Sequence, residues 1–385
     1  MNELFQRLGL SEALLTGLSR LGISQPTEIQ QQTIPLALAG KDIIGQSATG
    51  TGKTLAYLLP LLQKVDTSKR EAQAIILAPT HELASQIHQQ ILDLAVKAEL
   101  PVKSALIIGN VNVARQIEKL KDKPHIIVGS SGRILELIQK KKISAPAVRT
   151  IILDEADRLL DDNNIDSVKA VIKTTLRDRQ LMMFSATMPG PVLDKAKDLM
   201  REPGVISAKG QANVPQDISH MYLVAEQRDK IEMLRKLVGH LKIERALVFI
   251  NKSDNIETMV EKLNYHGLKA AAIHGDADKH GRKAAIDAFR KGNIKLLVAS
   301  DLAARGLDIP GITHVFNLDM PETAQIYLHR VGRTGRAGRS GTAISIVTVK
   351  EADLLKKFEK ILKITIAAKK LARGQVFDRS VSAKK

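Results

Sequence analysis

Ser47-Ala48-Thr49-Gly50-Thr51-Gly52-Lys53-Thr54 follows the short predicted strand Asp42–Gly45 and leads into a helix that begins near Lys53. Gly50 and Gly52 let the backbone turn its N–H groups toward a phosphate, and the helix adds the positive end of its dipole. In such a loop Lys53 reaches the outer phosphates, and the hydroxyl of Thr54 holds Mg²⁺. Ser47 replaces the first glycine of the general pattern, so a glycine-rich turn of another kind remains the alternative for this loop alone.

An acidic segment stands at the end of another predicted strand. Asp154-Glu155-Ala156-Asp157 comes directly after the apolar run Thr150–Leu153. Asp154 is placed to bind Mg²⁺ through water, and Glu155 to orient or deprotonate an attacking water. Asp157 can tie this segment to its neighbours. An acidic cluster by itself is more often a solvated turn or a helix cap, but the loop 47–54 favours a site for a nucleoside triphosphate.

A third string, His329-Arg330-Val331-Gly332-Arg333-Thr334-Gly335-Arg336, lies far along the chain. Arg333 and Arg336 are three residues apart, so on a helical turn they point the same way. As arginine fingers they would neutralise the charge of a transferred phosphoryl group; a basic surface patch is the alternative. Because these arginines are so distant from the loop 47–54, a second folded unit must complete a phosphoryl-transfer site.

The composition narrows the class of protein. A chain of 385 residues is long enough for two domains, and its net charge of +17 favours a polyanionic partner, nucleic acid before a membrane surface. Charge kept for solubility is the alternative. The absence of cysteine excludes disulfides and thiolate–zinc sites and fits a reducing cytoplasm. There is no secretory signal pattern and no apolar run long enough for a bilayer, so we expect a cytoplasmic protein without a membrane partner.

Short apolar runs alternate with longer amphipathic stretches, which is typical of βαβ units around a parallel sheet. The predicted strands are 42–45, 74–78, 104–108, 125–128, 150–153 and 181–184, then 220–224, 246–250, 270–273, 295–299, 314–317 and 342–347. The sequence predicts two α/β domains with doubly wound parallel sheets. They cover residues 1–207 and 218–366, joined by the linker 208–217, and a basic tail 367–385 follows.

Polar segments, several of them glycine-containing, follow the ends of these predicted strands. They are Gln46–Thr54, Pro79–Glu82, Ser130–Arg133, Asp154–Asp157 and Ser185–Thr187, then His274–Asp276 and Ser300–Asp308. In open α/β sheets, ligands bind outside the carboxyl ends of the strands. We therefore expect one functional edge on each domain, and the two edges can face each other across a cleft.

These strings resemble those of the DEAD-box RNA helicases, and the likeness runs over essentially the whole chain. Residues 22–30, Gly-Ile-Ser-Gln-Pro-Thr-Glu-Ile-Gln, are similar to the core of the family's adenine-recognition segment, here residues 3–31. The resemblance implies that Gln30 reads the adenine edge and that Phe5 stacks on the base. It also implies that Asp308, in the string Ala303–Asp308, contacts the ribose.

The same resemblance implies two RecA-like domains, with ATP and Mg²⁺ as cofactors. The implied ATP-binding residues include the whole loop: Ala48, Thr49, Gly50, Thr51, Gly52, Lys53 and Thr54. Lys53, Glu155, Arg333 and Arg336 are the implied catalytic residues, and Thr54 and Asp154 hold the metal. The residues implied to couple hydrolysis to RNA are Asp157, Ser185, Thr187, His329 and Arg330. The ten histidines show no ligand spacing for a second metal.

The resemblance extends to an RNA-contact group, with departures. The implied contacts are Pro79, Thr80, His81, Gly109, Ser130, Gly132, Arg133, Arg282 and Ser300. The departures are His81 for arginine, Asn110 for glycine, Ser130-Ser131 for Thr-Pro, Lys279 for glutamine, Ser300 for threonine and Ser47-Ala48 for Ala-Gln. Replacing arginine by His81 removes a permanent charge, because free histidine titrates near pH 6.5. The ATP-binding residues otherwise match the family.

Aromatic residues are 3% of the chain and tryptophan is absent, so platforms for base stacking are scarce. RNA binding should run through phosphates and 2′-hydroxyls without sequence preference. The resemblance implies an RNA-dependent ATPase, acting as a monomer, that unwinds or remodels short duplexes or RNA–protein complexes by closure of the two domains. The alternatives are an ATP-dependent RNA clamp or scaffold and a DNA translocase. Ribosomal RNA and ribosome precursors are candidate substrates, and the basic tail is either solvated or bound to RNA.

Overall fold

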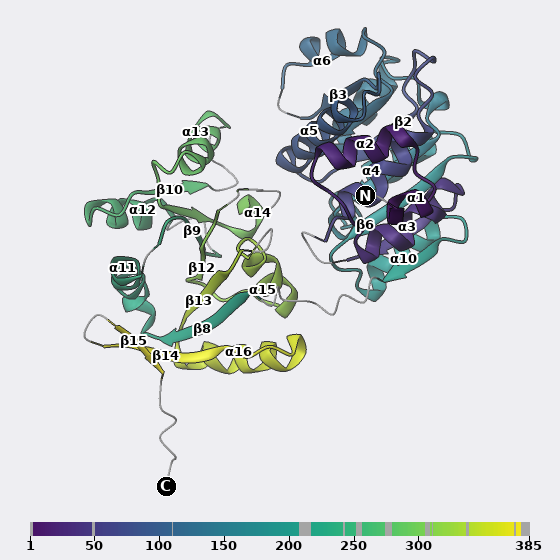
Figure 1. Ribbon diagram of the computed structural model, residues 1–385. Helices are drawn as coiled ribbons and strands as arrows, with labels where there is room; N and C mark the ends of the chain where they lie inside the picture. Colours follow the sequence, from purple (N-terminus) through teal and green to yellow (C-terminus); the bar gives the residue numbers. More distant parts are fainter. Residues whose placement is uncertain are drawn as a thin grey trace. The chain divides into compact units, whose positions relative to one another are not determined.

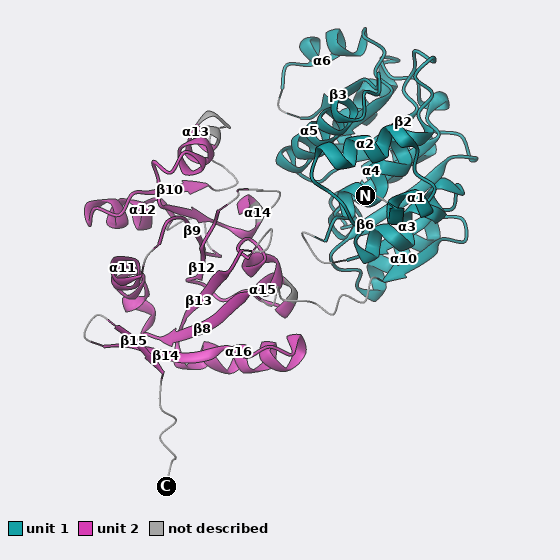
Figure 2. Cartoon of the chain, viewed as in Figure 1, with its two compact units in different colours: residues 1–211 teal, residues 212–385 magenta. Residues whose placement is uncertain are grey.

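The structure is a computed structural model of the chain. It describes residues 3–47, 51–109, 111–207, 217–241, 243–251, 256–273, 279–304, 309, 311–335, 339–372 and 375–378, without the side chains of residues 279, 280, 283, 302 and 325. The chain divides into two compact units, Met1–Gln211 and Ala212–Lys385 (Figure 2). Each unit is built around its own sheet. The predicted linker, apart from residue 217, lies outside the described residues.

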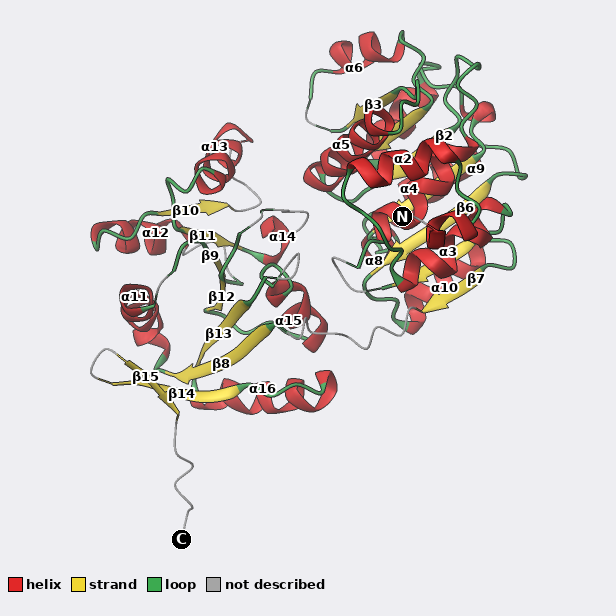
Figure 3. Ribbon diagram, in the orientation of Figure 1, coloured by secondary structure: helices red, strands yellow, loops and turns green. Residues whose placement is uncertain are grey.

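Unit 1 contains ten α-helices and seven strands among its described residues (Figure 3). The helices are α1 (Glu3–Arg7), α2 (Glu12–Arg20), α3 (Glu28–Leu38), α4 (Lys53–Lys64), α5 (His81–Lys97), α6 (Val113–Leu120), α7 (Ser131–Gln139), α8 (Ala156–Leu159), α9 (Ile165–Lys173) and α10 (Gly190–Leu199). The strands are β1 (Ile43–Gln46), β2 (Ala74–Leu77), β3 (Ser104–Ile107), β4 (Ile126–Gly129), β5 (Thr150–Asp154), β6 (Gln180–Ser185) and β7 (Gly204–Ser207).

The seven strands form one parallel sheet in the order β3-β4-β2-β5-β6-β1-β7. The six predicted strands of this half are confirmed, and β7 is an addition. β7 is a short edge strand in which Val205 is 53% exposed, so it lacks the apolar run that marks the buried strands. Because all strands are parallel, their carboxyl ends lie along one edge, as predicted.

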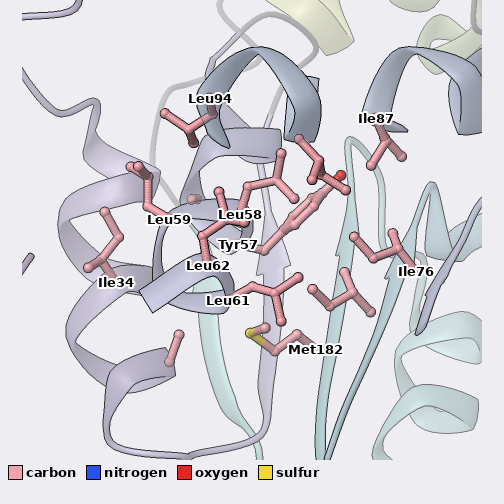
Figure 4. Close-up of a cluster of buried hydrophobic side chains, with 14 of the residues drawn as sticks. Ile34, Tyr57, Leu58, Leu59, Leu61, Leu62, Ile76, Ile87, Leu94 and Met182 are labelled. Atoms are coloured by element: carbon pink, nitrogen blue, oxygen red, sulfur yellow. The ribbon is translucent and has the colours of Figure 1, made fainter. Parts of the chain in front are cut away.

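Side chains that alternate along the strands bury both faces of this sheet. Ile76 and Met182 point into a cluster with α4 and α5, in which Leu58, Leu62 and Ile87 pack (Figure 4). The neighbouring strand residues, such as Ile75 and Leu181, belong to a second cluster with α7 and α9. Each fully buried aliphatic side chain of this kind contributes about 1.5–3 kcal/mol to folding. The strand ends that carry the polar segments are therefore held by a rigid, two-sided core.

Unit 2 is likewise built from helices around one sheet (Figure 1). The helices are α11 (Lys230–His240), α12 (Ile256–Tyr265), α13 (Lys279–Arg290), α14 (Asp301–Ala304), α15 (Ala324–Val331) and α16 (Val349–Leu362). The strands are β8 (Ile218–Val224), β9 (Ala246–Phe249), β10 (Ala270–Ile273), β11 (Leu296–Ala299), β12 (His314–Asn317), β13 (Gly341–Val347), β14 (Ala367–Ala372) and β15 (Gln375–Asp378). Short 3₁₀ turns occur at Ala145–Ala147 and Gln227–Asp229.

The second sheet has the order β10-β11-β9-β12-β13-β8-β14-β15. All six predicted strands are confirmed, and every pair is parallel except β14 with β15. Part of the predicted basic tail differs from the prediction, since residues 367–372 form β14 beside β8 and residues 375–378 form β15, which pairs with β14. Leu371 and Val376 pack against the core there, while Lys370 stays exposed. In the sequence, the many charged residues of this segment mask the alternation of apolar and polar residues that indicates a strand.

None of the helices in the described ranges combines the length and the apolarity that a bilayer crossing requires.

A buried histidine makes unit 2 sensitive to acid. The His220 side chain on β8 lies with Nδ1 3.0 Å from the Tyr327 hydroxyl, and its Nε2 has no hydrogen-bond partner among the described residues. Burial lowers the pKa of His220 from its ordinary 6.5 to about 4. Below pH 6.5 the unfolded chain therefore binds a proton that the folded chain does not, and acid favours unfolding.

We expect the wild-type protein to lose up to about 3 kcal/mol more stability between pH 6.5 and pH 4 than a His220→Gln variant. The measurement is urea unfolding at several pH values, followed by tyrosine fluorescence. Parallel losses in both proteins would contradict a role for this imidazole.

Candidate functional site

The loop 47–54 joins β1 to α4 and is tied back on itself. Ser47 and Thr51 place their hydroxyl oxygens 2.6 Å apart, and Lys53 Nζ donates to the Ser47 carbonyl. Gly52 caps α4 with φ +89°, and a Cβ there would lie 2.3 Å from Gln30 Nε2. Only glycine fits this position, because both the backbone angle and the space exclude a side chain. Lys53 is thus folded toward the loop that is predicted to hold phosphates.

Gln30 links the predicted adenine-recognition segment to this loop. Its Nε2 donates to the Gly52 carbonyl at 3.0 Å, and its Oε1 accepts from the Thr27 backbone N–H at 3.0 Å. Both ends of the amide are therefore engaged with the protein, and a role at the adenine edge stays a prediction. Phe5 needs a correction: its side chain is fully buried in the hydrophobic core of unit 1. Protein atoms cover its ring, so in this structure it has no face on which a base could stack.

Asp154 ends β5 and is buried beside Tyr57 of α4. The Tyr57 hydroxyl donates to Asp154 Oδ2 at 2.8 Å, and the Glu155 backbone N–H donates to Oδ1 at 2.9 Å. Burial raises the pKa of Asp154, against the opposing effects of the Lys53 charge and these two donors. Burial and the adjacent Asp154 also raise the pKa of Tyr57 well above its ordinary value. Tyr57 is absent from the sequence prediction, although it lies one helical turn after Lys53.

The residues around Asp154 fit the ligand requirements of Mg²⁺. The Thr54 hydroxyl hydrogen-bonds to Tyr57, so Thr54, Tyr57 and Asp154 form one cluster. Mg²⁺ at nucleotide sites usually takes one or two carboxylates and fills its shell with phosphate oxygens and water. In keeping with this, no group of three or more metal-binding side chains occurs in the part of the chain that the structure describes. One carboxylate and one hydroxyl suffice for a metal that arrives with a nucleotide.

The acidic segment continues into a link between two strand ends. Glu155 has φ +53°, a left-handed conformation that a non-glycine residue adopts at a cost of about 1–2 kcal/mol, and it begins the one-turn helix α8. Asp157 in that helix accepts from the Thr187 hydroxyl at 2.8 Å. The Thr187 N–H donates to the Ser185 hydroxyl, and the Ser185 carbonyl accepts from the Ser47 N–H at 3.1 Å. The predicted coupling residues of unit 1 are therefore brought together beside the loop.

The predicted RNA contacts of unit 1 gather at three other strand ends. Thr80 caps α5 by accepting from the Leu83 N–H at 3.2 Å, and a Cβ on Gly109 would lie 3.5 Å from His81 Nε2. The Ser130 N–H donates to the Ile107 carbonyl, which fixes the start of α7 beside β3. The predicted contacts are thus clustered, with Pro79, Thr80 and His81 after β2, Gly109 after β3, and Ser130, Gly132 and Arg133 after β4.

Arg133 is positioned by its own unit. Its Nη1 donates to the Val111 carbonyl at 3.0 Å, and its Nε pairs with Glu136 Oε2 at 2.8 Å. Because the sheet order is β3-β4-β2-β5-β6-β1, the boundary between β2 and β5 divides the functional edge. The RNA-contact group, which is predicted to bind RNA, follows β3, β4 and β2. The residues predicted to bind ATP and Mg²⁺ at strand ends of unit 1, which we call the nucleotide group, follow β5 and β1.

In unit 2 the structure places the predicted residue Arg330 in a buried network of hydrogen bonds. The Arg330 side chain is 1% exposed and binds Asp301 at 2.6 and 2.8 Å and Asn251 Oδ1 at 2.7 Å. It also donates to the Asp319 carbonyl and lies over the Phe249 ring, 5.0 Å from its centroid. These partners of the Arg330 guanidinium all lie in unit 2. The predicted coupling role of Arg330 is therefore corrected to one of holding α15 and α14 together.

The other predicted residues of unit 2 lie on or next to α13, α14 and α15. Arg333 follows α15 directly and His329 precedes Arg330 within it. Arg282 Nη2 donates to the Ala303 carbonyl at 2.9 Å, and the Ser300 hydroxyl accepts from the Ala303 N–H. Arg282 and Ser300 are therefore brought together at α14. Outside the described residues lie Ala48, Thr49, Gly50, Asn110, His274–Asp276, Asp308 and Arg336, and the side chain of Lys279.

Known proteins are similar in sequence to this chain over most of its length. The family model of DEAD/DEAH box helicases matches residues 27–196, and that of the helicase conserved C-terminal domain matches residues 229–338. The chain is 42% identical over 366 residues to the DEAD-box ATP-dependent RNA helicase CshC of Bacillus cereus, which covers 95% of this chain and 93% of the relative. It is 43% identical over 355 residues to the probable ATP-dependent RNA helicase YfmL of Bacillus subtilis, with 92% and 93% covered.

Solved structures share the fold. S. cerevisiae Dbp5 bound to RNA and ADP BeF3 matches with a TM-score of 0.85 and 31% identity, over 94% of this chain and 95% of that one. Mss116p bound to ssRNA and AMP-PNP, at 24% identity and a TM-score of 0.84, shares the two-domain RecA-like fold. The two family models and the relatives at 42–43% identity show that the chain belongs to the DEAD-box ATP-dependent RNA helicases.

Proposed function

We propose that the protein is an RNA-stimulated ATPase that unwinds or remodels short RNA duplexes or RNA–protein complexes by closure of its two units around ATP and RNA. The observation that carries the proposal is the divided edge of unit 1. There the nucleotide group and the RNA-contact group lie on neighbouring strands of one rigid sheet. The relatives CshC and YfmL, and Dbp5 with RNA and ADP BeF3, support the same pairing of ligands.

Each catalytic residue has a defined task in this proposal. Lys53 holds the outer phosphates of ATP, and Glu155 orients the attacking water. Mg²⁺, held by Thr54 and Asp154, supplies neutralisation of the phosphate charge when it is bound. Arg333 and Arg336 come from unit 2 and stabilise the charge that develops at the γ-phosphate, a contribution of about 10³–10⁵ in rate. Asp308 contacts the ribose.

Closure couples the two ligands thermodynamically. ATP and RNA each bind residues of both units, so either ligand favours the closed state to which the other binds more tightly. Within unit 1, the hydrogen bonds from Asp157 through Thr187 to Ser185 connect the acidic segment with the end of β6. RNA held through its phosphates can then be bent in the closed state until its complementary strand leaves.

ATPase assays with and without single-stranded RNA, together with displacement of a strand from a short RNA duplex, test this proposal. We expect RNA to stimulate hydrolysis and ATP to drive displacement, and both activities to be lost in a Lys53→Ala variant. Stimulated hydrolysis without displacement would assign the protein to the clamp class instead. Equal stimulation by DNA would contradict specificity for RNA. Ribosomal RNA and ribosome precursors are the substrates to test first, with the protein acting as a cytoplasmic monomer.

His81 offers a test of the RNA-contact group. At pH 8 we expect a His81→Arg variant to bind single-stranded RNA with a log–log salt slope about 0.7 steeper than wild type, since one further phosphate is neutralised. A Gln90→Arg variant, which adds the same charge on an exposed part of α5, is the control. Equal slopes for His81→Arg and wild type at pH 8 would remove His81 from the RNA contacts.

A further inference from the structure

The RNA-contact loop of this chain contains a serine where the family resemblance places a proline. Ser131 is the first residue of α7 and is 6% exposed. Its hydroxyl oxygen lies 2.6 Å from that of Ser167 on α9. Proline has no hydroxyl and could not make this contact. The hydrogen bond is therefore a feature of this chain's own sequence, at the loop whose neighbours Ser130 and Gly132 are proposed to touch RNA.

The hydrogen bonds continue from Ser167 toward the acidic segment. The Ser167 hydroxyl donates to the Asn164 carbonyl at 2.8 Å, so Ser131 is the donor in the bond between the two serines. Asn164 Nδ2 in turn donates to the Arg158 carbonyl at 3.3 Å and to Asp161 Oδ1 at 2.9 Å. Arg158 lies in α8, and its N–H donates to the carbonyl of Glu155 at 3.0 Å. A series of hydrogen bonds thus joins the loop 130–133 to the backbone of Glu155.

The receiving element, α8, is short, and its apolar residues pack in the core. α8 consists of the single turn Ala156–Leu159, and its N-cap residue, Glu155, has a left-handed backbone conformation. One isolated turn has almost no stability of its own, so its orientation depends on the groups that hold it. Asn164 holds the C-terminal end of α8 from outside. A small movement of the start of α7, on binding a phosphate, therefore shifts the group that fixes α8.

We propose that Ser131 and Ser167 are positioning residues that transmit the presence of RNA at the loop 130–133 to the segment that carries Glu155. The inference rests on the proposed function, because it requires RNA at this loop. It adds a connection from the RNA-contact group to the acidic segment, whereas the bonds among Asp157, Thr187 and Ser185 join the acidic segment to the end of β6. A structural bond that merely fastens α7 to α9 is the competing explanation.

The test compares Ser131→Ala, Ser167→Ala and the double variant in four measurements. These are ATP turnover without RNA, turnover at saturating RNA, the RNA concentration for half-stimulation, and thermal unfolding. We expect each single variant to lower RNA-stimulated turnover by about two- to tenfold, the range that corresponds to loss of one hydrogen bond. Turnover without RNA and the half-stimulating RNA concentration should stay within about twofold of wild type. The double variant should lose no more than either single variant, because both changes break the same connection.

Two further comparisons separate transmission from stability. Ser131→Thr and Ser131→Val have the same shape and differ in the hydroxyl, so stimulation should be high in the first and low in the second even if both are less stable than wild type. Ser104→Ala is the matched control: Ser104 bonds to His88 at 3.0 Å, at the opposite end of β3 from the RNA loop. We expect it to retain full stimulation.

The proposal would be overturned by additive losses in the double variant, by equal stimulation of the threonine and valine variants, or by a loss in Ser104→Ala as large as that in Ser131→Ala. Unchanged stimulated turnover in Ser131→Ala would also reject it. An absence of RNA stimulation in the wild-type protein would instead reject the proposed function. The two failures are therefore distinguishable.

Discussion

Replacement of Glu155 by glutamine will leave ATP and RNA bound and will lower turnover by about 10²–10⁴-fold, the range by which a positioned general base accelerates proton transfer. The amide keeps the size and the hydrogen-bonding reach of the side chain, but it cannot accept a proton from water. The phosphate loop, Asp154 and the RNA-contact group are untouched. The loss should therefore fall on kcat, with the affinities for ATP and RNA within a few-fold of wild type.

The measurements are single-turnover hydrolysis at saturating ATP and RNA, and binding of each ligand by fluorescence. Asp162→Asn is the matched control, because it makes the same carboxylate-to-amide change nearby on a side chain that is 95% exposed and forms an ion pair with Lys195. We expect that variant to hydrolyse ATP at the wild-type rate. Turnover of Glu155→Gln within tenfold of wild type would show that another group activates the water.

Replacement of Arg330 by alanine will destabilise unit 2 by about 3–5 kcal/mol, the usual cost of removing one partner of a buried ion pair. The change leaves the Asp301 carboxylate without its two bonds from Arg330 and leaves Asn251 Oδ1 and the Asp319 carbonyl without this donor. Lysine cannot restore the paired geometry, because it presents a single charged nitrogen rather than a planar fork. Arg330→Lys should therefore recover only part of the loss.

Urea unfolding followed by tyrosine fluorescence measures this effect in unit 2. The chain has four tyrosines and no tryptophan, and Tyr222, Tyr265 and Tyr327 lie in unit 2. Arg235→Ala is the control, because Arg235 forms a solvent-exposed ion pair with Glu232 and its loss should change the midpoint little. If the two variants unfold at the same urea concentration, the buried network of Arg330 does not stabilise the unit.

Most of the fold is readable from the sequence because its strands are buried on both faces. Runs such as Thr150–Leu153 and Ala246–Ile250 are continuous and apolar, and polar segments begin where they end. β7, β14 and β15 escape this reading, because they lie at or next to a sheet edge and are not buried on both faces, and because β14 and β15 carry charge. Their pairing depends on neighbouring strands that a local pattern does not reveal.

The site divides in the same way. Residues whose chemistry depends on a local string, such as Lys53, Asp154 and Thr187, are predictable, because backbone geometry after a strand dictates where they lie. Tyr57, Phe5 and Arg330 are different. Whether each one faces a ligand, a carboxylate or the core is decided by tertiary packing, and the string around Arg330 is the same for a coupling residue and for a buried anchor.

The position of β8 has a consequence for how the protein is made. It is the first strand of unit 2 to leave the ribosome, yet it lies between β13 and β14, which are synthesised after β9 to β12. In unit 1, β1 likewise pairs with β6 and β7, which are synthesised later. A nascent chain halted before these late strands exposes two unpaired edges, which favour aggregation. Each unit therefore completes its sheet only when its final strands have emerged, and we expect prematurely terminated products to become substrates for chaperones and proteases.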